Sequence, residues 1–209
     1  DMNISLPPQD LRIWLFHSLR ASSAVMIHSG AVVDVDKLEA YLGNYSALLK
    51  YFMPDITLGM KDVTAYSTIY SETCHELAHA SHFTKGGTGY WNKYIRYILE
   101  SYVKTGGQMY GDGNSEYAGY CEVGECWAYY LESMMYKERY GGSIPTFGTG
   151  YWFYPQVFRY LDERGLSRSD IFSVLGENVM SMDTVRTVLT ETFPEKRTII
   201  DQVFERYVN

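Results

Sequence analysis

Hydrophobic residues recur every three or four positions over much of the chain, and its first part also holds short continuous apolar runs. The helical spacing is clear over residues 36–52, where it predicts an amphipathic helix that Pro54 ends. The apolar runs predict three strands, at residues 11–17, 24–28 and 55–60. The first of these runs also fits a helix over residues 9–20.

Glycines divide the rest of the chain into further helices. A helix over residues 67–83 is stopped by Gly86 and Gly87, and a second helix follows at residues 90–103. Beyond a glycine-rich loop, a long helix is predicted over 117–140. A second glycine-rich loop leads to four short helices, at residues 155–163, 169–175, 183–192 and 194–207. The pattern as a whole predicts a helix-dominated α+β fold with a small sheet near its front.

Composition and charge narrow the class of protein. Hydrophobic residues make up 46% and charged residues 21% of the 209 positions, the balance of a globular protein with a sizeable core. The formal net charge of −7 argues against a nucleic-acid-binding surface, which needs clustered Lys and Arg. No apolar run approaches the roughly 20 residues of a transmembrane segment. Because the chain begins at Asp1 without an export signal, we expect a trimmed fragment from which upstream domains or a lipid anchor have been removed.

Aromatic residues are abundant, with 20 Tyr, 9 Phe and 4 Trp in the chain. Tyrosine covers area in clefts and interfaces while its hydroxyl stays in water, so a ligand-binding surface is one interpretation. A tyrosine-rich core and surface without a ligand is the other. Composition alone does not separate the two.

The candidate chemistry centres on a complete HExxH motif, which runs from His75 to His79. Four residues advance a helix by about 6 Å and 400°, so the two histidines lie one turn apart on nearly the same face and can reach one ion. Glu76 lies about 100° around the helix, where it can take a proton from water at the open position of the metal. The motif therefore predicts Zn²⁺ held by His75 and His79, with Glu76 as the catalytic base.

The alternative is a chance motif on a solvated helix. Histidine is scarce, with five residues in all, yet His75, His79 and His82 fall within eight positions. The flanking residues Leu77, Ala78 and Ala80 are small or apolar, as expected of a buried helix. Imidazole and carboxylate groups in a buried setting need a partner such as a metal ion, which favours the zinc site.

A catalytic zinc takes three protein ligands and leaves a fourth position for water. The metzincin pattern HExxHxxGxxH fails, because His82 stands at its glycine position and Lys85 at its third histidine position. The other common third ligand is a glutamate from a downstream helix, and Glu125 and Glu122 both lie on the helix predicted over 117–140. They are about 60° apart around that helix, so either side chain could face the metal.

With these residues the chain resembles the gluzincins, zinc peptidases in which the HExxH helix is followed by a helix that carries a ligand glutamate, in several cases as ExxA. Residues 125–128 (ECWA) match that pattern, 46 positions (125 − 79) after His79. The resemblance implies Glu125 as the third ligand, whereas Glu122 would accept a hydrogen bond from a ligand histidine. In gluzincins a carboxylate four residues after the ligand often has that second role, but Tyr129 stands there, so the partner that orients the histidine is unassigned.

Other residues near the motif have open roles. His82, two turns along the helix from His75, is a metal ligand, a substrate contact or a hydrogen-bonded structural residue. Glu72 either supports a ligand or is a solvated helix residue. Gluzincins commonly supply a Tyr or His that stabilises the oxyanion, and Tyr117 and Tyr120 are candidates by proximity to Glu125 in the sequence.

The resemblance also implies an edge strand that binds extended peptide through main-chain hydrogen bonds, and residues 55–60 are the candidate by position. Cys74 and Cys126 each adjoin a presumed ligand, but adjacent side chains on a helix point about 100° apart, so neither is expected to bind the metal. We expect both to be buried apolar residues, with a Cys74–Cys126 bridge as the alternative.

The resemblance is specific over residues 67–132. It implies a zincin-like catalytic domain over 1–150 and a helical C-terminal subdomain over 151–209 packed on it, or one continuous domain. It implies a zinc metallopeptidase, a hydrolase with peptide or protein substrates. HELAHASHF with a later GECWAYYLE is similar to zinc metallopeptidases of bacterial envelope lipoproteins, so we expect an extracytoplasmic location. The alternatives are a non-catalytic zincin-fold module that binds glycan or protein on the cell surface, and a zinc-stabilised structural domain.

Overall fold

The computed structural model describes residues 10–31 and 53–207, and the account below concerns these two ranges. Helices make up 58% of the described residues and strands 6%. The helix-dominated α+β fold predicted from the sequence is therefore confirmed, with six α-helices and one three-stranded sheet in the described part of the chain. The helix predicted over 36–52 lies outside the described residues.

The sheet consists of β1 (Ile13–Phe16), β3 (Ile56–Gly59) and β2 (Ser23–Ala24), in that spatial order. β1 runs parallel to β3, and β2 runs antiparallel to it. The first and third predicted strands are present, whereas of the strand predicted over 24–28 only Ala24 lies in a strand, the two-residue β2. The first apolar run forms β1 and not the alternative helix.

The prediction that residues 55–60 form an edge strand is wrong. β3 pairs with β1 on one side and with β2 on the other, so it is the central strand. Its place in the chain, just before the active helix, carries no information on lateral order, because both neighbours come from earlier in the sequence. Within the described residues β2 pairs on one side only, which leaves the other side of that strand as an edge.

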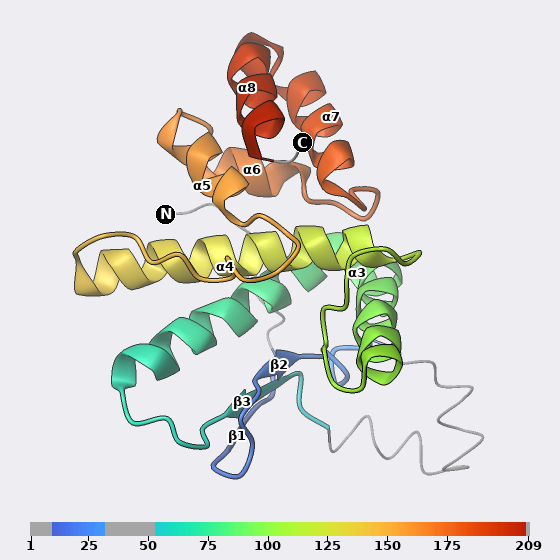
Figure 1. Cartoon of the computed structure of the whole chain (residues 1–209), viewed down its shortest axis with the longest axis vertical. Coiled ribbons are helices and arrows are strands. Elements are labelled where there is room, and N and C mark those ends of the chain that lie inside the picture. Colours follow the sequence, from blue (N-terminus) through green and yellow to red (C-terminus); the bar gives the residue numbers. More distant parts are fainter. Residues whose placement is uncertain (1–9, 32–52, 208–209) are drawn as a thin grey trace.

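The helix α3 (Tyr66–Thr105) is one element with a sharp kink. Gly87 has φ 74° and ψ 174°, a conformation with positive φ that favours glycine, and the helix changes direction there. The first arm of α3 contains the helix predicted over 67–83, and the second arm contains the helix predicted over 90–103. The predicted stop is thus a kink, and Figure 1 shows the two arms diverging from it.

The long helix α4 (Ala118–Tyr140) crosses the first arm of α3 and lies between it and the C-terminal helices (Figure 1). The predicted short helices are all present, as α5 (Gln156–Glu163), α6 (Arg168–Val174), α7 (Met182–Thr192) and α8 (Arg197–Tyr207). A 3₁₀ turn, η2 (Pro194–Lys196), forms the first turn of the last predicted helix. None of the described helices combines the length and the apolar composition that crossing a membrane demands.

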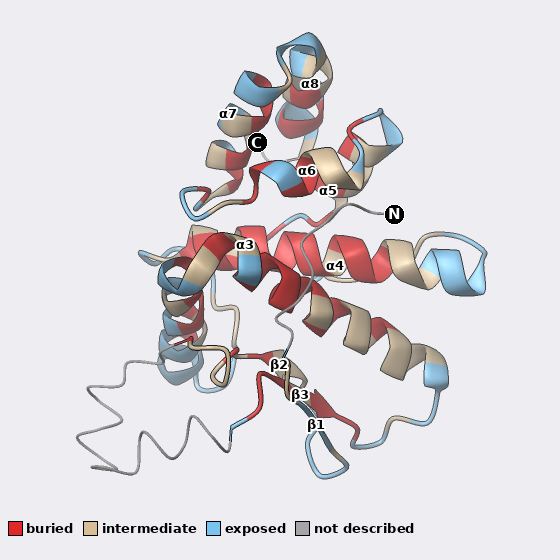
Figure 2. Ribbon diagram, turned by 180° about the vertical axis from the view of Figure 1, so that it is seen from behind, coloured by how far each residue is buried: buried red, intermediate tan, exposed pale blue. Residues whose placement is uncertain are grey.

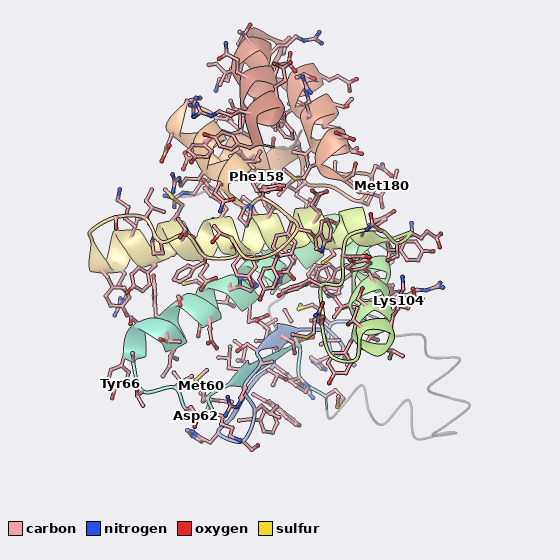
Figure 3. The ribbon with its side chains drawn as sticks, in the orientation of Figure 1. Met60, Asp62, Tyr66, Lys104, Phe158 and Met180 are labelled. Atoms are coloured by element: carbon pink, nitrogen blue, oxygen red, sulfur yellow. The ribbon has the colours of Figure 1, made fainter. Side chains whose placement is uncertain are left out.

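Two buried clusters join these layers, and α4 contributes to both. The first lies between α4 and the C-terminal helices, where the Trp127 ring centroid is 5.0 Å from that of Phe172 and 6.3 Å from that of Phe158, labelled in Figure 3. The second joins the sheet, α3 and the start of α4, and it contains Trp91 and Ile56. Figure 2 shows the buried stretch running through the middle of α4 and along the adjacent part of α3. The division of the chain near residue 150 stays a prediction.

Candidate metal centre

The first arm of α3 places both histidines of the HExxH motif on one face. His75 and His79 are one helical turn apart, and their Nε2 atoms lie 3.1 Å from each other. Both side chains are buried. The helix can lie this deep because its small residues pack on both sides, with Ala78 in the cluster around α4 and Ala80 in the cluster beneath the sheet.

Glu125 reaches the same point from α4. Its Oε2 atom is 3.5 Å from Nε2 of His75, and its Oε1 atom is 3.6 Å from Nε2 of His79. The hydroxyl of Tyr94, on the second arm of α3, donates a hydrogen bond of 2.5 Å to Oε1. Gly124 permits this approach, because a Cβ atom there would lie 3.3 Å from the Tyr94 ring. The carboxylate is therefore held from both arms of α3.

The separations of these atoms suit a small divalent ion. The two imidazole nitrogens are 3.1 Å apart, each lies within 3.6 Å of one of the two carboxylate oxygens, and one ligand atom from each residue lies within 4.8 Å of the others, separations that a single ion with bonds of about 2.0–2.1 Å can bridge after small adjustments. Oε2 of Glu125 is buried without a hydrogen-bond partner among the described residues, and such an oxygen requires a compensating positive charge. His75, His79 and Glu125 form a buried group that could hold a metal ion, so the structure brings the three predicted ligands together.

Glu132 supplies the orienting partner that the sequence left unassigned. Its Oε2 atom lies 3.1 Å from Nδ1 of His75. A hydrogen bond from Nδ1 leaves the lone pair of Nε2 free to face the metal group. Glu132 is seven residues, or two helical turns, after Glu125, so the same face of α4 carries both. This seven-residue spacing is the sequence signal from which Glu132 could have been identified. At the expected position, four residues after the ligand, Tyr129 instead packs its ring against His75, with centroids 4.4 Å apart.

The charges of the three ligand residues are set by burial and by one another. Burial would lower the pKa of His75, but the adjacent carboxylates of Glu125 and Glu132 raise it well above its ordinary value. Burial lowers the pKa of His79 to about 3, against the opposing influence of Glu125. Burial would raise the pKa of Glu125, but His79, His75 and the Tyr94 hydroxyl hold it below its ordinary value. A neutral imidazole and an ionised carboxylate, the forms that bind metal ions, are thus already favoured at two of the three positions.

Glu76 lies buried beside the ligand group. Burial, with smaller contributions from Glu125, Glu72 and Glu132, raises its pKa to about 8 against the opposing influence of His75. Its Oε2 atom has no hydrogen-bond partner among the described residues. Glu76 is therefore a carboxyl group free of structural hydrogen bonds at that oxygen and able to exchange a proton near neutral pH.

His75, Glu76, His79 and Glu125 line a cavity of about 360 Å³. One wall comes from residues 22–25, which include the edge strand β2. Further lining residues come from the second arm of α3 and the loop that follows it. The cavity thus brings residues of an edge strand together with the candidate metal group.

Two hydrogen bonds of Ser22, which we call the clamp, fix the start of β2 to α3 and to β3. Ser22 donates a hydrogen bond of 2.8 Å to Glu72 of α3 and accepts one of 3.1 Å from the main-chain N–H of Gly59. The chain before Ser22 passes so closely over Gly59 that a Cβ atom there would lie 2.6 Å from the carbonyl oxygen of Ala21. This close approach explains the glycine in β3. The sequence left two roles open for Glu72, a solvated residue or a support of a ligand histidine. The structure favours neither, because Glu72 accepts the hydrogen bond of Ser22.

Glu122 and His82, the two alternative metal ligands considered from the sequence, lie outside the candidate metal group. Glu122 accepts a hydrogen bond of 3.3 Å from the main-chain N–H of Met182, because its offset of about 60° from Glu125 turns it toward the C-terminal helices. It is neither in the ligand group nor a partner of a histidine. His82 shares a helical face with His75 but lies about 10 Å farther along the axis. It is packed against Tyr90 and Trp91, outside the ligand group.

The tyrosines proposed for oxyanion stabilisation do not line the cavity. The Tyr120 hydroxyl accepts a hydrogen bond from Lys93 at 3.0 Å, and the Tyr117 ring lies beneath the guanidinium of Arg96. The tyrosines that line the cavity among the described residues are Tyr94 and Tyr110. Tyr110 comes from the glycine-rich loop between α3 and α4, whose position no helical spacing predicts.

The three cysteines of the chain are free. Cys121 and Cys126 are buried and Cys74 is half-buried, so the alternative of a Cys74–Cys126 bridge is not formed. Neither residue beside a ligand contributes to the metal group, as expected from the direction of adjacent side chains on a helix.

Comparison of the chain with protein-family models, curated proteins and solved structures gives no match. A function for this protein must therefore be inferred from the chemistry and geometry of its own residues.

Proposed function

We propose that the protein is a zinc-dependent metallopeptidase that hydrolyses peptide bonds with a metal-activated water. The observation that carries this proposal is the convergence of two imidazoles and one carboxylate on one point, next to an uncommitted carboxyl group and in the lining of a cavity. Two nitrogen ligands and one oxygen ligand are typical of catalytic zinc, which keeps a fourth position for water.

Bound zinc would supply Lewis acidity, which polarises a carbonyl group and makes water more acidic. Glu76 would take the proton from water and return it to the amine that leaves. Its buried position beside His75 and the oxygen that has no hydrogen-bond partner among the described residues leave this carboxyl group available for both transfers. Glu132 would keep the His75 ring oriented, and Tyr94 would do the same for the Glu125 carboxylate.

The edge strand β2 supports a peptide as the substrate. A strand that pairs on one side only can add an extended peptide through main-chain hydrogen bonds. Residues Ser22 to Val25 line the same cavity as Glu76, so a peptide paired there would pass over the metal group. We propose an extracytoplasmic location on the resemblance to zinc peptidases of bacterial envelope lipoproteins.

Metal content and peptide cleavage test this proposal together. The purified protein, loaded with zinc, is assayed by elemental analysis and by mass spectrometry of a digested peptide library, as wild type, Glu76→Gln and Glu122→Gln. We expect one zinc ion in each, loss of cleavage by at least about 100-fold in Glu76→Gln alone, and near-normal cleavage in the control Glu122→Gln. Equal cleavage by wild type and Glu76→Gln, or no zinc uptake, would contradict the proposal. Zinc uptake without cleavage of any peptide would favour the non-catalytic module.

A further inference from the structure

The cavity beside the metal group has a predominantly aliphatic lining. We call this lining the aliphatic wall, and it consists of Val25, Ile27, Ile95, Ile98, Leu99 and Met109. Three of its members lie on the second arm of α3 at helical spacing i, i+3 and i+4, so they form one continuous stripe. Two others come from the chain after β2, and the last from the loop before α4.

Packing among residues 10–31 and 53–207 does not account for the whole wall. On the second arm of α3 the ring of Tyr94 and the side chain of Ile95 are buried and belong to the core beneath the sheet. Ile98 is only half-buried, and Leu99 keeps 48% of its surface exposed. Contiguous exposed apolar side chains next to a polar site are typical of a surface that a ligand covers.

The residues that line the cavity argue against a charged side chain as the ligand of the aliphatic wall. No lysine or arginine is among the described residues that line it, and its only acidic residues are Glu76 and Glu125. Glu125 belongs to the candidate metal group, and Glu76 follows His75 in the chain. An acidic side chain seated on the aliphatic wall would therefore find no basic side chain to pair with, and a charged group of either sign would lose its hydration against aliphatic surface.

We infer that the aliphatic wall is the subsite for one large uncharged apolar side chain of the substrate, adjacent to the peptide bond that is cleaved. This inference rests on the proposed function. A cavity of about 360 Å³ is at the small end of ligand sites, so it holds one side chain with its flanking main chain and not a long segment. Side chains such as those of leucine, methionine and phenylalanine satisfy it, whereas alanine leaves the wall uncovered.

The wall is tested with hydroxamates, which bind zinc through one end and carry a chosen tail at the other. Affinities of acetohydroxamate, 4-methylpentanohydroxamate and a tail of similar length ending in a carboxylate are measured on the zinc-loaded protein by calorimetry. We expect the branched alkyl tail to bind at least about tenfold more tightly than acetohydroxamate, because each methylene group buried in an apolar site adds to binding. The carboxylate tail should gain nothing over acetohydroxamate.

Two substitutions at Ile98 make the test specific. In Ile98→Ser the preference for the alkyl tail should fall several-fold, and in Ile98→Arg the carboxylate tail should become the tighter ligand of the two. The matched control is Val103→Ser, since Val103 is 80% exposed on the same arm and does not line the cavity. Its tail preference should equal that of the wild type.

Equal affinity of the wild type for the three hydroxamates would overturn the subsite and leave the peptidase proposal in place. An unchanged preference in both Ile98 variants would do the same. Failure of the wild type to bind zinc would overturn the subsite and the peptidase proposal together, so the two failures are distinguishable.

Discussion

Oε2 of Glu132 lies 3.1 Å from Nδ1 of His75, so the helix that provides the carboxylate ligand also orients one of the two imidazoles. Glu125 and Glu132 are two turns apart on α4, and His75 stands opposite both. A displacement of α4 would therefore move a candidate ligand and the support of another at once. This arrangement couples the geometry of the metal group to the packing of α4 on α3.

Replacement of Glu132 should weaken zinc binding without removing a ligand. We expect Glu132→Ala to lower zinc affinity by about 10–100-fold, because the His75 ring loses the acceptor that holds its orientation. Glu132→Gln keeps an acceptor oxygen and should lose less. Competition with a chromophoric chelator measures both, with Glu163→Gln on the exposed side of α5 as the control. Wild-type affinity in Glu132→Ala would show that His75 needs no partner from α4.

The clamp between Ser22 and Glu72 should affect cleavage and not metal content. Loss of either hydrogen-bonding partner frees the start of β2 from the active helix, so the edge strand would present its main chain less well to a peptide. We expect Ser22→Ala and Glu72→Ala each to lower kcat/KM by about 3- to 10-fold with zinc still bound. The double variant should be no worse than Ser22→Ala, because the Ser22 substitution already removes the hydrogen bond to Glu72 along with the one from Gly59. Strictly additive losses would argue that the two residues act separately.

The sequence predicted the parts of the site that follow from helical geometry alone. The positions of His75, Glu76 and His79 relative to one another follow from a spacing of 3.6 residues per turn. Glu125 required one further step, the return of a second helix, for which the resemblance to gluzincins supplied the motif. The choice between Glu125 and Glu122 depended on the rotation of α4 about its axis, which the packing of Trp127 against the C-terminal helices settles in the structure.

Other features could not be read from the chain because they depend on lateral order and loop shape. β3 carries the same apolar run whether it lies at the edge or in the centre of the sheet, and only pairing with β1 makes it central. Tyr110 lies in a loop that distant residues hold in place. Its main-chain carbonyl accepts hydrogen bonds of 2.7 Å from the hydroxyl of Tyr97 and from the indole N–H of Trp152, which is 42 residues away. A contact of that sequence separation leaves no local signal.

Removal of zinc should destabilise the protein but leave it folded. The two buried clusters that join the sheet, α3, α4 and the C-terminal helices contain none of the ligands, so they should persist without the ion. At a free zinc concentration 1,000 times the Kd, binding adds about 4 kcal/mol to the free energy of unfolding. We expect a chelator to lower Tm while the helical circular dichroism at 25 °C is retained. Complete loss of helix on chelation would favour the zinc-stabilised structural domain.

The stability of the metal-free protein should fall in acid, in part because of His82. Burial lowers the pKa of this residue to about 3, with a smaller effect of Lys85, and neither ring nitrogen has a hydrogen-bond partner among the described residues. The unfolded chain therefore binds a proton below pH 6.5 that the folded chain does not, so the stability present above pH 6.5 is lost as the pH falls toward 3. His82→Leu should remove about 1.4 kcal/mol per pH unit from the slope of unfolding free energy between pH 6 and pH 4. Urea unfolding of both proteins in chelator measures the slopes, and His79, present in both, cancels from the comparison. Identical slopes would mean that His82 takes up a proton in the folded protein as readily as in the unfolded chain.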